Sequence, residues 1–243
     1  MTSPLFLLLS LLAASEPTPR TTPAVRAALA AKGRPKPDRD ADAARKPGVV
    51  LTLAGLKPGM RAADLMAGGG YFTELLSRVV GKKGHVYSQN NAISGRVYAG
   101  AWEERLRDNR LPNTERLESE LEKLPFAEAS LDVVLLIQFY HDTFWMKVDR
   151  TAMNAAIWKA LKPGGRFLVI DHEAAAGAGG TGSKSLHRVE SALVKAELLA
   201  AGFVLEKASA ALANPADAHD LSAFDPAVRG KTDQFLLIFR KPG

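Results

Sequence analysis

The sequence of 243 residues contains no cysteine. Without a thiol the chain can form neither a disulfide bond nor a lipoprotein thioether, so an exported form would fold without oxidative help. Long apolar runs are also lacking: Leu5 to Ala14 is about half of the roughly 20 residues that a membrane-spanning helix needs. A hydrophobic content of 47% is nevertheless sufficient to fill the core of one α/β domain without metals or covalent bridges.

The N-terminus is typical of a signal peptide. The apolar run from Leu5 is followed by the small residues Ala13 and Ser15, which suit cleavage after Ser15. The segment lacks the Lys or Arg that usually precedes such a run, so a helix of a cytoplasmic protein is the alternative. We expect a signal peptide over residues 1–15 and an exported, periplasmic protein without a membrane span after cleavage.

The net charge of +6 is unevenly distributed along the chain. Residues 16–50 contain eight basic and four acidic side chains, an excess of 8 − 4 = 4 positive charges, and the rest is close to neutral. No basic face interleaved with aromatic residues follows, so a nucleic-acid partner is not expected. We predict a flexible, basic, Pro/Ala-rich lead-in over residues 16–46 and a single domain over residues 47–243.

Apolar runs alternate with helical patterns through the predicted domain. Expected strands lie at residues 60–66, 85–89, 114–119, 131–138, 166–170, 203–207 and 234–240. The helix after the first strand has apolar residues at Phe72, Leu75, Leu76, Val79 and Val80. This order predicts an α/β fold with a doubly wound, mainly parallel seven-stranded sheet, an antiparallel last strand and helices on both faces.

The first strand ends in three glycines, Gly68, Gly69 and Gly70, with Asp64 four residues before the first. Adjacent glycines let the backbone turn sharply and approach a ligand closely. A dinucleotide fold would have Gly-x-Gly-x-x-Gly here, and the chain also lacks a Ser-Tyr-Lys cluster. A nicotinamide oxidoreductase is therefore the less favoured interpretation, and the pattern predicts a ligand that needs a glycine floor and a nearby carboxylate.

Two further motifs follow in order. Glu120 to Phe126 has the sequence Glu-Leu-Glu-Lys-Leu-Pro-Phe and precedes Leu131-Asp132-Val133-Val134, and a Leu-Lys-Pro-Gly-Gly turn spans residues 161–165. Together with the glycine loop they resemble the class I, Rossmann-like, S-adenosylmethionine-dependent methyltransferases. Asp171-His172, Leu186-His187-Arg188 and the segment 214–233 are similar to a little-characterised bacterial group of predicted, often exported, methyltransferases.

The resemblance implies S-adenosylmethionine as the cofactor and methyl transfer to a small-molecule acceptor. It implies these cofactor-binding residues: Asp64, Ala67, Gly68, Gly69, Gly70, Tyr71, Gln89, Asn90, Glu120, Leu121 and Gln138. Two positions depart from the family. Met66 stands where glycine is usual, so its side chain must turn away from the ligand or close the pocket floor. Gln89 and Asn90 replace the carboxylate that usually binds both ribose hydroxyls, which lowers the expected affinity by about 1 kcal/mol.

Polar residues after the fourth and fifth strands are candidates for chemistry. Methyl transfer needs an aligned acceptor and, for a protonated acceptor, a base, a role that suits histidine. We predict His172 as the base, oriented by Asp171 or Glu173, with further catalytic candidates Tyr140, His141 and His187. Predicted substrate contacts are Arg188, Arg229 and Lys231, the last two in a segment expected to fold over the site. No metal site is predicted, because the histidines and Asp171 lack a short paired spacing.

A second class of function fits part of the sequence. The absent ribose carboxylate, and a compartment not expected to supply the cofactor, would suit a non-catalytic exported binding domain that retains the fold. Cofactor binding without turnover, or no binding, would identify that class. The acceptor and the oligomeric state have no sequence pattern to indicate them.

Overall fold

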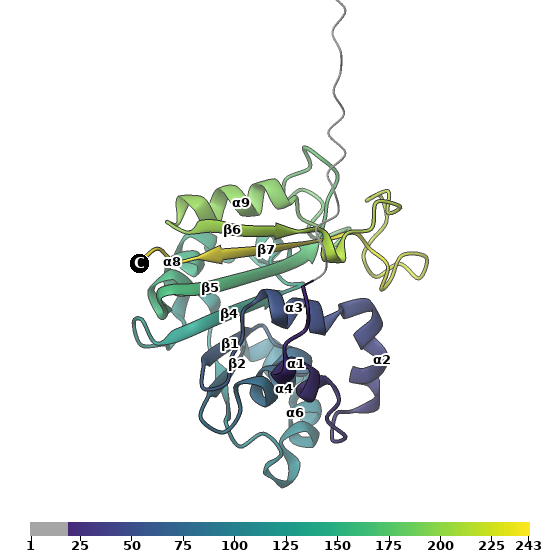
Figure 1. Cartoon of the computed structure of the whole chain (residues 1–243). Helices are drawn as coiled ribbons and strands as arrows, with labels where there is room; N and C mark the ends of the chain where they lie inside the picture. The colour runs from purple at the N-terminus through teal and green to yellow at the C-terminus, as the bar shows by residue number, and fades with distance from the viewer. Residues whose placement is uncertain (1–18) are drawn as a thin grey trace, which may run out of the picture.

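The computed structural model of the protein describes residues 19–243 (Figure 1). The predicted signal peptide lies outside these residues. The strands are β1 (Arg61–Leu65), β2 (His85–Asn90), β3 (Thr114–Glu118), β4 (Leu131–Ile137), β5 (Leu161–His172), β6 (Val204–Ser209) and β7 (Gln234–Arg240). The helices are α1 (Pro23–Leu29), α2 (Lys36–Arg45), α3 (Pro47–Leu53), α4 (Tyr71–Val80), α5 (Ala92–Val97), α6 (Ala99–Leu106), α7 (Asp142–Trp145), α8 (Arg150–Ala160) and α9 (Ser191–Ala200).

The strands form one sheet in the order β3-β2-β1-β4-β5-β7-β6. Strands β1 to β5 pair in parallel, and β7 lies antiparallel between β5 and β6. The predicted doubly wound fold with an antiparallel last strand is confirmed. Strand order reverses between β1 and β4, and open sheets of this kind bind ligands beyond the carboxyl ends of such a pair.

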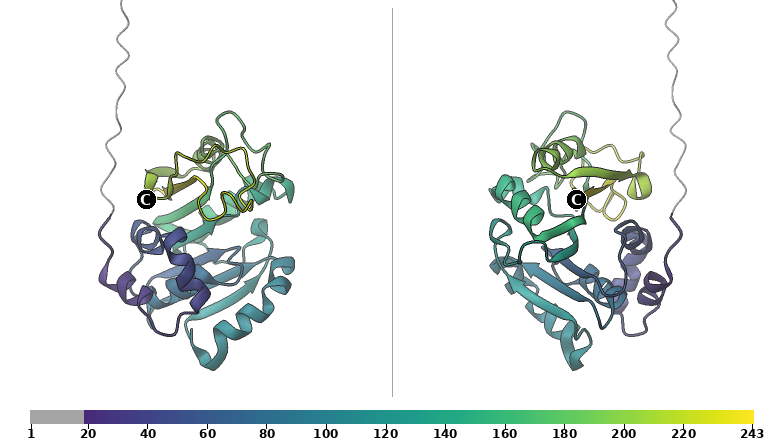
Figure 2. Two further views of the ribbon diagram at one scale, coloured as in Figure 1. Left: turned by 90° about the vertical axis from the view of Figure 1, so that its right-hand side faces the viewer. Right: turned by 60° about the vertical axis from the view of Figure 1, so that its left-hand side comes forward.

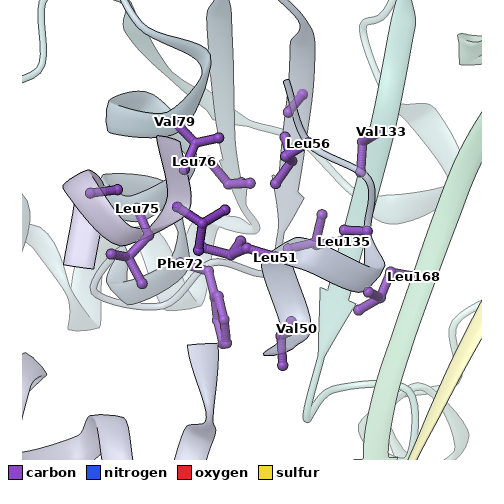
Figure 3. Packing of buried hydrophobic residues seen from close by; sticks show 14 of the residues in the cluster. Val50, Leu51, Leu56, Phe72, Leu75, Leu76, Val79, Val133, Leu135 and Leu168 are labelled. Atoms are coloured by element: carbon purple, nitrogen blue, oxygen red, sulfur yellow. The ribbon is translucent and has the colours of Figure 1, made fainter. Parts of the chain in front are cut away.

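Alternation along each strand produces two apolar layers. On one face Val133 and Leu135 of β4 and Leu168 of β5 pack with residues of α3 and α4, as Figure 3 shows for Leu51 and Leu75. On the other face their neighbours in sequence, including Val134 and Leu136, pack against α8 and α9. The right-hand view of Figure 2 shows the purple N-terminal helices and the green helices on opposite sides of the sheet.

The segment expected to be a flexible lead-in differs from that expectation from Pro23 onward. Thr22 caps α1 through its side chain, and Val25 and Ala28 of this helix are buried in the core. Helix α2 is charged and has no buried residue, but Asp42 pairs with the buried Arg34 at 2.6 Å. The charge and proline content of this segment therefore do not indicate that its two short helices pack on the domain. Within residues 19–243 no helix is both long and apolar enough to cross a membrane.

Candidate functional site

A cleft of about 580 Å³ lies beside the glycine loop, at the carboxyl ends of β1 and β4. Volumes of this order suit small molecules and cofactors. Its walls come from α2, the glycine loop, the α5–α6 region, the β4–α7 connection, the end of β5 and the loop between β6 and β7. The residues lining it include Asp38, Arg45, Met66, Ala67, Gly68, Gly69, Tyr71, Ser94, Tyr98, Ala101, Arg105, Ile137, Gln138, Phe139, His141, Asp142, His172 and Phe224.

The glycine loop is held by close packing against α6. Gly68 and Gly70 have φ of +55° and +82°, and a Cβ on Gly70 would lie 2.6 Å from the Trp102 ring. Trp102 Nε1 donates a hydrogen bond of 2.8 Å to the Gly68 carbonyl. A side chain at position 70 is therefore excluded both by the backbone conformation and by space. This explains the last of the three glycines by packing, because Gly70 is buried and does not line the cleft.

Arg105 of α6 connects the loop to the N-terminal helices. Its Nε donates to the Gly69 carbonyl at 2.7 Å, and its terminal nitrogens pair with Asp38 of α2 at 2.9 Å and with the buried Glu74 at 2.5 Å. No sequence motif indicates Arg105 or Asp38, because each lies in a mostly polar helix. Only the tertiary fold brings them to the glycine loop.

Asp64 and Tyr71 flank the loop in different ways. Asp64 is 3% exposed, accepts a hydrogen bond of 2.6 Å from Thr73 and does not line the cleft. Burial, opposed in part by the Thr73 hydrogen bond, raises the pKa of Asp64 to about 6. Tyr71 does line the cleft; its hydroxyl donates to Asp42 at 2.6 Å, and the Arg45 guanidinium lies 4.7 Å from its ring centre. Of the two predicted cofactor contacts, Tyr71 is thus the one the fold exposes to a ligand.

The two amides after β2 hold the loop rather than facing the cleft. Gln89 Oε1 accepts from the Met66 backbone at 3.1 Å, and Nε2 donates to the Ser119 carbonyl at 2.6 Å. Asn90 makes two hydrogen bonds to Gly68, accepting at 3.0 Å and donating at 3.1 Å. The structure thereby differs from the predicted ribose contact of Gln89 and Asn90, because both side chains are buried and already bound to backbone.

Met66 separates the cleft from a second, smaller cavity of about 80 Å³. Met66 and Phe139 line both spaces, and Glu120 and Leu121 line only the smaller one. Met66 also has φ of +47°, a left-handed conformation that is costly for a residue with a side chain. The residue thus borders both cavities, and its predicted effect on the floor of the ligand pocket stays a prediction.

A cluster of imidazoles and carboxylates forms where β4 and β5 end. His141 Nδ1 lies 2.7 Å from Asp171 Oδ1, and His141 Nε2 lies 3.1 Å from Asp142 Oδ1 and 3.3 Å from His187 Nδ1. Although burial acts in the opposite direction, the charge of Asp171 and hydrogen bonds to both carboxylates raise the pKa of His141 to about 10. Burial likewise opposes the shift at Asp142, but the hydrogen bond from His141 keeps the pKa of that carboxyl below its usual range. Without another ligand, His141 is therefore a cation at neutral pH and not a base.

His172 lies beside this cluster, with its ring centre 6.1 Å from that of His141, and lines the cleft. Its Nδ1 is 2.7 Å from Thr232 Oγ1, and burial lowers the pKa of its ring to about 4. The structure differs from the predicted orienting contacts: Asp171 accepts from the His172 backbone and from the His141 ring, and Glu173 accepts from the Ser191 backbone. Thr232 orients the His172 ring instead, across a sequence distance that no motif indicated.

Several predicted residues have other partners. Tyr140 is buried, and its hydroxyl bonds to Glu197 at 2.6 Å, on the α8–α9 side. Arg188 is fully buried and pairs with Asp217 at 2.8 and 3.1 Å, so it anchors the loop between β6 and β7 rather than offering its charge to a substrate. Arg229 and Lys231 are exposed and are not among the residues lining the cleft. The loop between β6 and β7 that contains them contributes Phe224 to the lining instead.

Comparison with known proteins agrees with the fold. A family model described as a methyltransferase domain matches residues 63–169, which run from β1 into β5. Residues 63–169 are a methyltransferase domain. The predicted family is thus confirmed, and with it S-adenosylmethionine as the cofactor of this kind of domain. The matched region of this domain includes the glycine loop, His141 and Asp142 but ends before His172 and His187.

Individual relatives cover the methyltransferase domain to different extents. The ubiquinone/menaquinone biosynthesis C-methyltransferase UbiE of Vibrio campbellii is 32% identical over 127 residues, which cover 50% of this chain and 45% of that protein. The chain thus matches less than half the length of this curated relative. A SAM-dependent methyltransferase structure from Aquifex aeolicus has a TM-score of 0.60 at 22% identity and covers 86% of this chain and 99% of its own. The [4+2]-cyclase SpnF shares the fold at a TM-score of 0.59 and 19% identity, with 82% of each chain covered.

The residues around the cleft fit S-adenosylmethionine in part. Among the lining groups, Arg45 offers a guanidinium to a carboxylate and the loop offers backbone next to Gly68 and Gly69. The carboxylates of Asp38 and Asp142 line the cleft but already pair with Arg105 and His141. The hydroxyl-binding carboxylate of β2 is replaced by amides that are already bound. Met66 separates Glu120 and Leu121, the predicted adenine side, from the main cleft.

Proposed function

We propose that the protein transfers a methyl group from S-adenosylmethionine to a small-molecule acceptor in the cleft beside the glycine loop. The observation that carries the proposal is the position of this cleft at the carboxyl ends of β1 and β4 of a class I methyltransferase domain, where such sheets bind their ligands. Bound there, the cofactor supplies an electrophilic methyl group on a sulfonium.

The walls favour a small acceptor. Arg45 and Asp38 of α2 border the cleft on one side, and Phe224 from the loop between β6 and β7 borders it on another. Such walls exclude water from the reacting groups and hold an acceptor atom in line with the methyl group, which can contribute roughly 7–11 kcal/mol to the rate. A polymer or a large folded partner would have to displace these helices and the loop.

His172 is the base in this proposal. The hydrogen bond between Nδ1 and Thr232 fixes the ring, and Nε2 has no hydrogen-bond partner among residues 19–243. The low pKa keeps the ring neutral at neutral pH. In the tautomer whose Nδ1–H donates to Thr232, the lone pair of Nε2 accepts the proton of a hydroxyl or amine acceptor. His141 is not the base in this proposal, because both of its ring nitrogens already face carboxylates, those of Asp171 and Asp142.

Titration calorimetry of the full chain with S-adenosylmethionine and S-adenosylhomocysteine tests the proposal. We expect one ligand per chain, with S-adenosylhomocysteine competing for the same site. Ala67→Leu, which adds bulk to the cleft wall, should abolish binding, whereas Ala216→Leu, on an exposed loop, should not. Thermal unfolding of both variants checks that they fold. Absence of heat at millimolar ligand, equivalent to weaker than about −4 kcal/mol, would refute the proposal and favour a non-catalytic domain that retains the fold.

Export is part of the proposal, because the first fifteen residues match a signal peptide. Intact mass of the protein recovered from its native cell should correspond to a chain that begins at Glu16. A mass that includes Met1 would place the protein in the cytoplasm. This measurement is independent of cofactor binding.

A further inference from the structure

Three potential metal ligands meet at the end of β4. His141 Nε2, Asp142 Oδ1 and His187 Nδ1 are separated by 3.1, 3.3 and 3.5 Å. Three ligands of a tetrahedral ion at 2.0–2.2 Å would be roughly 3.3–3.6 Å apart, so the three atoms already have nearly the spacing that one ion requires. From these distances we propose that His141, Asp142 and His187 form a binding site for a divalent transition-metal ion such as Zn²⁺.

The support behind His141 is the second argument. Metal-bound histidines commonly donate their other ring N–H to a carboxylate, which fixes the tautomer and turns the free nitrogen toward the ion. Asp171 is fully buried and accepts from His141 Nδ1 at 2.7 Å, and its other oxygen accepts from the His141 backbone at 2.8 Å. This arrangement directs Nε2 toward Asp142 and His187. Trp145 similarly holds Asp142 by donating to Oδ1 at 2.7 Å.

The position of His187 is the third argument. Its backbone has φ of +53°, in the left-handed region that histidine adopts more often than most residues other than glycine. Its ring packs edge-on against Phe224, with centroids 4.6 Å apart. Both features place an imidazole next to His141 that comes from 46 residues further along the chain.

The chemistry of the three donors selects the type of ion. Two imidazole nitrogens and one carboxylate oxygen suit Zn²⁺ and its neighbours in the first transition series rather than Mg²⁺ or Ca²⁺, which prefer oxygen. The carboxylates of Asp142 and Asp171, 3.1 and 2.7 Å from the two ring nitrogens of His141, place negative charge around the three donors, which favours a dication. The ion binds the lone pair of Nε2, so a proton on that nitrogen is released to solvent. Three protein ligands leave one position free, and His141 and Asp142 line the cleft, so that position is accessible to an acceptor molecule.

The site is testable without S-adenosylmethionine, so its outcome is independent of the proposed methyl transfer. Untagged full-length protein is freed of metal with a chelator and titrated with Co²⁺, followed by visible absorption, and with Zn²⁺, followed by calorimetry. We expect one ion per chain and a Co²⁺ spectrum typical of four-coordinate nitrogen and oxygen ligation. Zn²⁺ should also raise the thermal unfolding temperature of the wild-type protein.

Variants assign the ligands. His187→Ala and Asp142→Asn should weaken Zn²⁺ binding by more than the roughly 10- to 100-fold expected for Asp171→Asn, which removes only the support of His141. His219→Ala and His85→Ala are matched controls, since each removes a histidine that pairs with a carboxylate elsewhere, and both should retain wild-type affinity. Absence of stoichiometric binding to the wild-type protein would overturn the proposal. So would binding that survives in His187→Ala and Asp142→Asn or disappears in a control.

Discussion

Asp64 should make the protein less stable as the pH rises from about 4 to about 6. Its carboxyl group is 3% exposed, and burial raises its pKa from 3.8 to about 6. A carboxyl whose pKa is higher in the folded than in the unfolded state binds its proton more tightly when folded. The stabilisation is therefore fully present below about pH 4 and is lost as the pH rises through about 6.

The size of the effect follows from the shift. A difference of about two pKa units corresponds to about 3 kcal/mol, which is a large part of the stability of an ordinary domain. Asn at position 64 retains the shape and can accept the Thr73 hydroxyl, but it does not ionise. The free energy of unfolding of Asp64→Asn minus that of the wild-type protein should thus increase by up to about 3 kcal/mol between pH 4 and pH 7.

Urea unfolding at half-unit pH intervals measures this difference. Other carboxyls contribute equally to both proteins and cancel in the subtraction, while any fixed cost of the new amide shifts the curve without changing its slope. Asp220→Asn, at an exposed position, controls for the loss of one negative charge. A difference that stays flat from pH 4 to pH 7, or that falls, would refute the assignment of Asp64 as a buried carboxyl that ionises with difficulty.

Two further substitutions test the glycine loop and its partition. Met66→Gly should tighten S-adenosylhomocysteine binding in calorimetry, because it joins the cleft to the cavity of about 80 Å³ beside Glu120. The same substitution should lower the free energy of unfolding by about 2 kcal/mol, since the packing lost exceeds the strain relieved at the left-handed backbone. Unchanged or weaker binding would contradict the partition by Met66. Gly70→Ala should lower the free energy of unfolding in urea by about 3 kcal/mol, because alanine is strained in the left-handed conformation and its Cβ clashes with Trp102. Gly164 also has a positive φ but has open space around it, so Gly164→Ala should show only the backbone cost. Equal losses in the two variants would argue against the clash.

Much of the fold was predictable because it depends on local patterns. Alternating apolar runs and helical spacing specify strands and helices, and their order leaves few topologies for an α/β chain. The glycine loop was recognisable because it needs particular residue types at adjacent positions, whereas the predicted Leu-Lys-Pro-Gly-Gly turn lies within strand β5. Helices α1 and α2 were not predicted, because most of the segment is charged and only a few residues, such as Val25 and Arg34, make the buried contacts that attach it to the domain.

The candidate site was only partly predictable, for a different physical reason. Sequence alone determined the class of fold, the loop at the end of β1 and the histidines and acidic residues that follow β4 and β5. Which of these side chains face each other depends on where distant segments meet. Asp171 forms its side-chain contact with the ring of His141 instead of that of His172, Arg188 pairs with Asp217, and His187 lies beside His141. Hydrogen bonds and burial of this kind act between neighbours in space rather than in sequence. Only the tertiary structure therefore decided the partners, the ionisation and the roles of these residues.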